Sequence, residues 1–195
     1  MENTFTIPDD QMFFSMQELK ERGFSHYKIN QMVAQGILIK LNRKYYENTG
    51  YQGEESELYY AYVFVPNGVV CLMSAAVYYN LSSYRPDVIE VAIPRKAKVS
   101  TLPEWPELNI IYYTDERFNV GIRTVKEGKN QFRIYDIEKT VTDIVFYREK
   151  VGIEETKEVL TTYLQRRDRN LNRLVRYAEF LKCGDTMKKY LEVLV

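Results

Sequence analysis

The chain has 195 residues, 45% of them hydrophobic, and a formal net charge of zero from 27 basic and 27 acidic residues. These values are ordinary for a globular protein and suit one large or two small domains. A zero balance argues against a wholly basic nucleic-acid-binding protein. The two cysteines, Cys71 and Cys183, lie far apart and show no metal-ligand spacing, so we expect neither a metal site nor a cofactor.

The first residues, Met1-Glu2-Asn3-Thr4, lack the basic start and apolar run of a secretory signal peptide. No segment approaches the roughly 18 consecutive apolar residues that a membrane-spanning helix needs. We therefore expect a cytoplasmic protein with reduced thiols and no membrane partner.

Residues 15–46 predict two short helices joined by a tight turn and followed by a strand hairpin. Ser15 and Glu18 form an S-x-x-E capping box at the start of the first helix. Gly23 suits the left-handed turn, and Ser25 suits the N-cap of the second helix. The second helix then carries apolar residues at i, i+3 and i+4, which are Ile29, Met32 and Val33.

The hairpin is expected from strands at 37–41 and 45–47, with Asn42-Arg43-Lys44 at the tip between them. This order of elements is the layout of a winged helix-turn-helix, whose second helix commonly lies in a DNA major groove. We assign residues 1–50 to such a domain, with the hairpin tip as its wing.

Basic residues dominate this segment locally, since six of them stand between residues 20 and 44 against Glu21 alone: Lys20, Arg22, Lys28, Lys40, Arg43 and Lys44. The predicted DNA-contacting residues are on the polar face of the second helix and at the tip: Ser25, His26, Lys28, Asn30, Gln31, Arg43 and Lys44. Phosphate contacts supply most non-specific affinity, so this small patch predicts weak binding of double-stranded DNA by a single copy. We expect a monomer or weak dimer that pairs on a repeated DNA site.

Two other interpretations stay open at this stage. Winged helices also serve as scaffolds that bind proteins or RNA, and a polar helix face is commonly just solvated. His26, the single histidine, has no partner in the sequence for metal binding or a catalytic triad. No Gly-rich phosphate loop is present either, so we expect no enzymatic activity.

A polar segment with two glycines, residues 48–56, predicts a domain boundary. We assign 55–195 to a second domain with a mixed sheet over 57–135 and helices over 136–195. The expected elements are helices at 57–65 and 74–81 (capped by Ser74), strands at 69–72, 88–93, 109–113, 121–127 and 131–135, and four helices that begin with one capped by Asp136. The predicted fold class is α+β: a winged helix-turn-helix followed by a mixed α/β domain that ends in a helical bundle.

Three groups in the second domain are candidate sites. Glu138, Thr140 and Asp143 on one helix are either a functional cluster or a cap and a buried hydrogen-bond set. Two basic patches suit nucleic acid or a solvated face, because arginines and lysines on one face can contact phosphates. The residues of these patches are Arg95, Lys96, Lys98, Arg166, Arg167 and Arg169.

Several segments, taken in order and spacing, carry a resemblance to a known family. They are Phe14-Ser15, Gly23-Phe24-Ser25, Gly36-Ile37-Leu38 and Arg43-Lys44 with Tyr46, then residues 74–82, 89–95 and 134–144. Together they resemble the AbiEi family, the antitoxin and transcriptional repressor half of abortive-infection toxin–antitoxin pairs. Family members usually have a glycine before the last aromatic residue of the wing, whereas this chain has Arg43-Lys44-Tyr45-Tyr46.

The resemblance implies a specific role for each domain. The winged helix would bind inverted repeats in the promoter of its own operon and repress it. The second domain would counteract a partner toxin that resembles a nucleotidyltransferase, and the two proteins need not form a stable complex.

Overall fold

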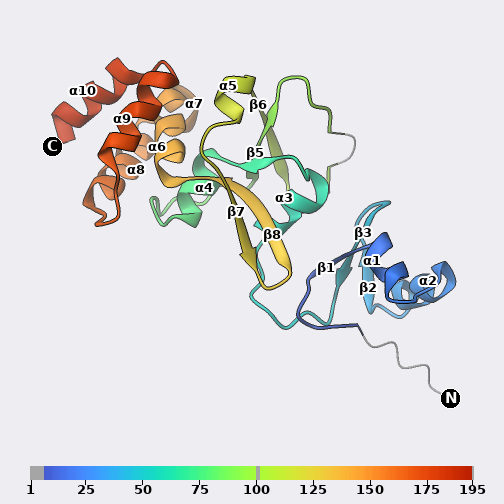
Figure 1. The fold of residues 1–195 in the computed structure, drawn as a ribbon. Coiled ribbons are helices and arrows are strands. Elements are labelled where there is room, and N and C mark those ends of the chain that lie inside the picture. Colours follow the sequence, from blue (N-terminus) through green and yellow to red (C-terminus); the bar gives the residue numbers. More distant parts are fainter. Residues whose placement is uncertain (1–6, 100–101, 195) are drawn as a thin grey trace.

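The computed structural model describes residues 7–99 and 102–194, and over these residues the chain is an α+β protein with two separate sheets (Figure 1). The predicted α+β class is confirmed at this level. Residues 1–6, where we expected no signal peptide, lie outside the described residues.

The first unit contains β1 (Phe13–Ser15), α1 (Met16–Glu21), α2 (His26–Ala34), β2 (Leu38–Lys40) and β3 (Tyr45–Asn48). Its three strands form an antiparallel sheet in the order β1-β3-β2. The capping box at the start of α1 is present, because Glu18 N donates to Ser15 Oγ and Ser15 N donates to Glu18 Oε2. Strand β1 is an addition to the predicted elements.

Six fully buried side chains, contributed by both helices and all three strands, hold this unit together: Phe14, Leu19, Ile29, Met32, Leu38 and Tyr46. Gly23 adopts φ +86° in the turn before α2, which is the left-handed conformation that glycine adopts at least cost. Since Ile29 and Met32 face this core, the opposite face of α2 is directed to solvent.

The second unit is built on a five-stranded mixed sheet. Its strands, in the spatial order β6-β5-β4-β8-β7, are β6 (Leu108–Tyr113), β5 (Ile89–Pro94), β4 (Val69–Val70), β8 (Asn130–Tyr135) and β7 (Ile122–Glu127). The pairs β5–β6 and β4–β8 are parallel, and the pairs β4–β5 and β7–β8 are antiparallel.

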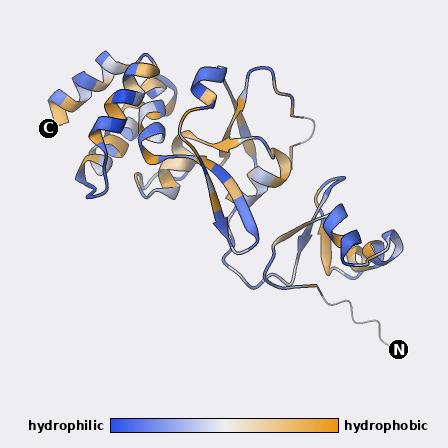
Figure 2. Ribbon diagram, in the orientation of Figure 1, coloured by the Kyte–Doolittle hydropathy of each residue, from blue (hydrophilic) through white to orange (hydrophobic). Residues whose placement is uncertain are grey.

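The helices of the second unit lie beside this sheet, and the last of them form the C-terminal end of the molecule (Figure 1). They are α3 (Leu58–Phe64), α4 (Leu72–Tyr78), α5 (Asp115–Phe118), α6 (Ile137–Phe146), α7 (Arg148–Val151), α8 (Ile153–Gln165), α9 (Leu171–Phe180) and α10 (Gly184–Leu194). Figure 2 shows hydrophobic residues along the central strands, whereas α9 and α10 carry both polar and hydrophobic residues. The short helices α5 and α7 were not predicted, because a single turn has no detectable periodicity.

The start of α4 differs from the prediction, and Ser74 is not its N-cap. The helix begins at Leu72, and its first amides donate to a strand residue instead: Met73 N and Ser74 N lie 2.7 and 3.3 Å from Glu90 Oε2. Ser74 Oγ accepts from Glu90 N and donates to the Val88 carbonyl. The cap was missed because its carboxylate comes from a residue 16 positions away.

The two units are joined by direct contacts. The Phe13 ring packs edge-on against Tyr60, with centroids 4.9 Å apart, and Met12 N donates to Asn130 Oδ1 at 3.0 Å. Asn130 Nδ2 in turn donates to the Tyr51 hydroxyl at 2.9 Å, so the polar segment 48–56 packs against β8. These contacts place the β2–β3 hairpin beside the larger sheet.

Candidate nucleic-acid interface

Helix α2 and its N-cap carry five of the predicted contact residues, which differ in exposure. Ser25 Oγ accepts from Lys28 N at 3.3 Å and caps the helix. His26 and Asn30 are exposed, and Lys28 and Gln31 are half-buried. Tyr27, which the sequence analysis did not single out, is 71% exposed, and its hydroxyl accepts from Gln31 Nε2. The sequence feature that could have indicated this residue is an aromatic side chain on the polar face of the predicted second helix.

The hairpin tip is shaped by Asn42 rather than by a glycine. Asn42 Oδ1 accepts from Lys44 N at 2.8 Å and from Tyr45 N at 2.9 Å, which closes a side-chain-mediated turn. Met16 N donates to the Lys44 carbonyl at 2.7 Å and ties the tip to the start of α1. The side chains of Arg43 and Lys44 are consequently exposed on an ordered turn.

The cations of this segment are available for external anions. Among the residues that the structure describes, no ion pair includes any of the six: Lys20, Arg22, Lys28, Lys40, Arg43 and Lys44. Arg22 lies over the Phe14 ring, 5.1 Å from its centroid. Unpaired surface cations can each neutralise a phosphate without first breaking an internal pair.

A cleft of about 630 Å³ separates the hairpin tip from the larger sheet, and we call it the hairpin-tip cleft. Its walls come from residues 41–45 of the hairpin, residues 63–67 at the end of α3 and just after it, and residues 93–94 and 97–99 at the end of β5 and just after it. Three cationic side chains, Arg43, Lys44 and Lys98, line it together with no acidic residue. The structure thus brings one residue of the predicted 95–98 patch beside the predicted wing.

The other predicted patch residues lie elsewhere. Arg95 lines a different cavity, between β6, α6 and α9, while Lys96 is exposed and lines neither cavity. The loop after α8 uses Arg166 internally, since its guanidinium donates to both Asp168 carboxylate oxygens and to the Tyr79 carbonyl. Helices α8 and α9 also lie at the far end of the molecule from α2 (Figure 1).

Arg167 and Arg169 complete that loop without joining the α2 surface. Both are exposed, and Arg169 Nη1 donates to the Arg166 carbonyl at 2.8 Å. The predicted patch at 166–169 is therefore a small surface that is partly neutralised by Asp168.

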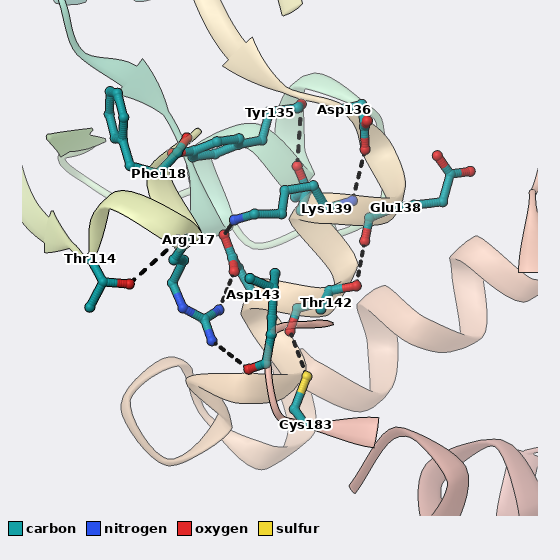
Figure 3. A network of polar contacts seen from close by, with 12 residues as sticks. Thr114, Arg117, Phe118, Tyr135, Asp136, Glu138, Lys139, Thr142, Asp143 and Cys183 are labelled. Atoms are coloured by element: carbon teal, nitrogen blue, oxygen red, sulfur yellow. Dashed lines mark hydrogen bonds and ion pairs between the residues drawn. The ribbon is translucent and has the colours of Figure 1, made fainter. Parts of the chain in front are cut away.

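The cluster at Glu138, Thr140 and Asp143 is a buried polar network (Figure 3). Asp143 is fully buried and accepts from both Arg117 Nη1 and Lys139 Nζ. Glu138 accepts from the Tyr163 hydroxyl at 3.1 Å. These contacts tie α6 to α5 and α8, which matches the cap and buried hydrogen-bond alternative.

Within this network, Asp143 has two cationic partners, because Arg117 and Lys139 share its carboxylate. Burial lowers the pKa of the Lys139 ammonium from its ordinary value, although Asp143 opposes that shift. Arg117 is 7% exposed and stacks on Phe146, with its guanidinium carbon 3.7 Å from the ring centroid. Sequence reasoning missed Arg117, since it lies between the strands expected at 109–113 and 121–127, where no element is predicted.

Within the described residues, no group of three His, Cys, Asp or Glu side chains could hold a metal ion. No helix there has the length and apolar character to cross a bilayer.

No family model matches the chain, and no curated protein matches it. Among solved structures, the chain is similar to the crystal structure of the RV2827C protein from Mycobacterium tuberculosis, with 13% sequence identity and a TM-score of 0.49. That alignment covers 95% of this chain and 76% of the other chain. A similarity this low carries no argument about function.

Proposed function

We propose that residues 7–50 are a winged helix-turn-helix that binds double-stranded DNA, with α2 as the recognition helix and the β2–β3 hairpin as the wing. One observation carries this proposal. The first unit combines a polar face of α2 with an ordered, cationic hairpin tip of its three-stranded sheet. Asn30 and Gln31 supply amides suited to base edges, and Lys28 supplies a phosphate contact.

The electrostatics of the first unit support this proposal. Among the described residues, the six cations of the segment from 20 to 44 have no ion pair, and Lys98 adds a seventh cation at the hairpin-tip cleft. A DNA backbone that follows α2 and enters this cleft would meet Arg43, Lys44 and Lys98 together. Because few phosphates are neutralised by one copy, we propose that two copies bind adjacent half-sites.

The biological role that we propose follows from the resemblance to the AbiEi family. The protein would be an antitoxin and an autoregulatory repressor of its own toxin–antitoxin operon, acting in the cytoplasm. Its DNA site would be the inverted repeats of its promoter. The second unit would counteract a nucleotidyltransferase-like toxin, with or without a stable complex.

A second candidate function is a non-catalytic module that binds protein or RNA and uses the first unit as a scaffold. The exposed ring of Tyr27 on α2 favours it, since aromatic side chains are enriched in protein interfaces and also stack on unpaired bases. The two functions differ in whether affinity for duplex DNA depends on sequence.

A fluorescence-anisotropy titration with the protein's own upstream DNA distinguishes them. We expect wild-type affinity to fall steeply with salt, and the double variant Lys28→Ala/Arg43→Ala to flatten the slope of log K against log salt by about 2 per bound copy, or about 1 per phosphate contact. Lys98→Ala should flatten it by about 1 if the hairpin-tip cleft contacts the backbone.

The matched control is Lys126→Ala, an exposed lysine on β7 with no ion pair among the described residues. It removes the same charge from the second unit and should leave affinity and slope unchanged. Equal losses in Lys126→Ala and the double variant would contradict an interface on α2 and the hairpin.

A further inference from the structure

A second cavity, of about 470 Å³, opens between β6, α5, α6 and the end of α9. Its volume falls within the ~300–1,000 Å³ usual for small-molecule sites. We call it the aromatic cavity, because three large aromatic side chains that line it are unusually exposed: Tyr112 (53%), Phe146 (39%) and Phe180 (56%). They come from β6, α6 and α9, so the tertiary fold gathers them.

Cationic side chains surround the same hollow. Arg95, Lys150 and Lys182 line it, and none of these three has an ion pair among the residues that the structure describes. Glu116 supplies the one carboxylate among the lining residues. The rim therefore carries a net positive charge beside exposed aromatic faces.

The wall of the cavity adds to this positive field. Arg117 lines the cavity and stacks on Phe146, while its guanidinium shares Asp143 with the buried Lys139. Because Arg117 shares the Asp143 carboxylate with Lys139, its guanidinium at the cavity wall is only partly neutralised. A low-dielectric wall strengthens the attraction for an anion in the cavity.

Aromatic faces and unpaired cations at one concave site match a planar ring that carries a phosphate. Nucleobases stack on aromatic side chains regardless of their identity, and lysine and arginine bind phosphate oxygens. We infer that the aromatic cavity binds a nucleoside monophosphate, with the base against Phe180 or Tyr112 and the phosphate against Lys182 and Arg95. This site is independent of the proposed DNA-binding surface.

Lys182 offers a test that leaves the fold intact. It adopts φ +61° after the end of α9, a conformation that glycine adopts at less cost. Lys182→Gly therefore removes the ammonium group while relieving backbone strain. Phe180→Ala removes an exposed ring, and Lys126→Ala is the charge-matched control on β7.

The experiment is an NMR titration of the full chain with AMP, GMP, CMP and UMP, and separately with adenosine and inorganic phosphate. We expect saturable shifts at residues lining the aromatic cavity with the monophosphates. Adenosine and phosphate should each bind about tenfold or more weakly, because each has half of the contacts. Lys182→Gly and Phe180→Ala should each weaken AMP binding by about 5- to 100-fold, and Lys126→Ala should not change it.

A further arm separates the two sources of this ligand. Short single-stranded RNA with a 5′-phosphate is compared with AMP and with the same RNA lacking the phosphate. Tighter binding of the phosphorylated RNA than of AMP assigns the cavity to strand ends, and equal binding assigns it to the free nucleotide. Equal binding of adenosine and AMP, wild-type affinity in both variants, or the absence of saturable shifts would overturn the inference.

Discussion

Replacing Asp143 with asparagine should destabilise the protein severely. Asp143 and Lys139 are fully buried and the Arg117 side chain is 8% exposed, so Asp143→Asn leaves two buried cations without the carboxylate they share. Removing one partner of a buried ion pair costs about 3–5 kcal/mol. Since the free energy of unfolding of a typical domain is about 5–15 kcal/mol, this loss is about 30–50% of the stability for a domain near the middle of that range.

The assay is thermal and urea unfolding followed by circular dichroism. For a chain of this size, each kcal/mol lowers the Tm by about 2–4 °C, so Asp143→Asn should lower it by about 6–20 °C. The matched control is Asp168→Asn, whose ion pair with Arg166 is exposed and should hardly affect the Tm. Adding Lys139→Met to Asp143→Asn should recover part of the loss. If Asp143→Asn shifts the Tm as little as Asp168→Asn does, the network does not stabilise α6 as argued.

Three further predictions concern single substitutions. Burial lowers the pKa of Lys139 in the folded protein below its ordinary 10.5. Between these two pKa values the unfolded chain binds more protons than the folded one, so wild-type stability should rise as the pH increases from the folded pKa towards 10.5. Urea midpoints measured across this range should show that rise in the wild type and not in Lys139→Met; parallel profiles would refute it. Gly121 has φ +76°, and a Cβ there would lie 2.7 Å from Lys139 Cβ. Gly121→Ala should therefore lower the free energy of unfolding in urea by more than about 1 kcal/mol. A wild-type urea midpoint would show that the site relaxes freely. Asn42→Ala removes the acceptor for Lys44 N and Tyr45 N. It should weaken DNA binding in anisotropy titrations and change the free energy of unfolding by no more than about 1 kcal/mol. Unchanged affinity would show that the geometry of the hairpin tip is irrelevant to binding.

Local signals in the sequence predicted much of the first unit. The capping box at Ser15, the N-cap at Ser25 and the left-handed Gly23 each act within a few residues, and all three are present in the structure. The predicted cap of α6 is present as well, because the Asp136 side chain accepts from Lys139 N at 2.8 Å. Strand β1 was missed, since three residues show no alternation and it depends on pairing with β3.

Features that depend on distant residues were not predictable in this way. The true cap of α4 is the Glu90 carboxylate on β5, and the partner of Arg117 is Asp143 on another helix. The sequence identifies the basic residues, but it does not show which of them lie together in space. Lys98 lies beside the hairpin tip, whereas Arg95 lines the aromatic cavity. Short-range patterns fix helix ends and turns, while the grouping of charges depends on how the sheets and helices pack.

The central claim is sequence-specific binding of duplex DNA by the first unit. The most direct measurement is the ratio of wild-type affinities for the protein's own upstream DNA and for a shuffled duplex of equal length, at low salt and at a salt concentration near physiological. The account predicts a ratio of about 10³ or more, centred on an inverted repeat. A ratio near one, at both low and physiological salt, would contradict it and favour the protein- or RNA-binding alternative.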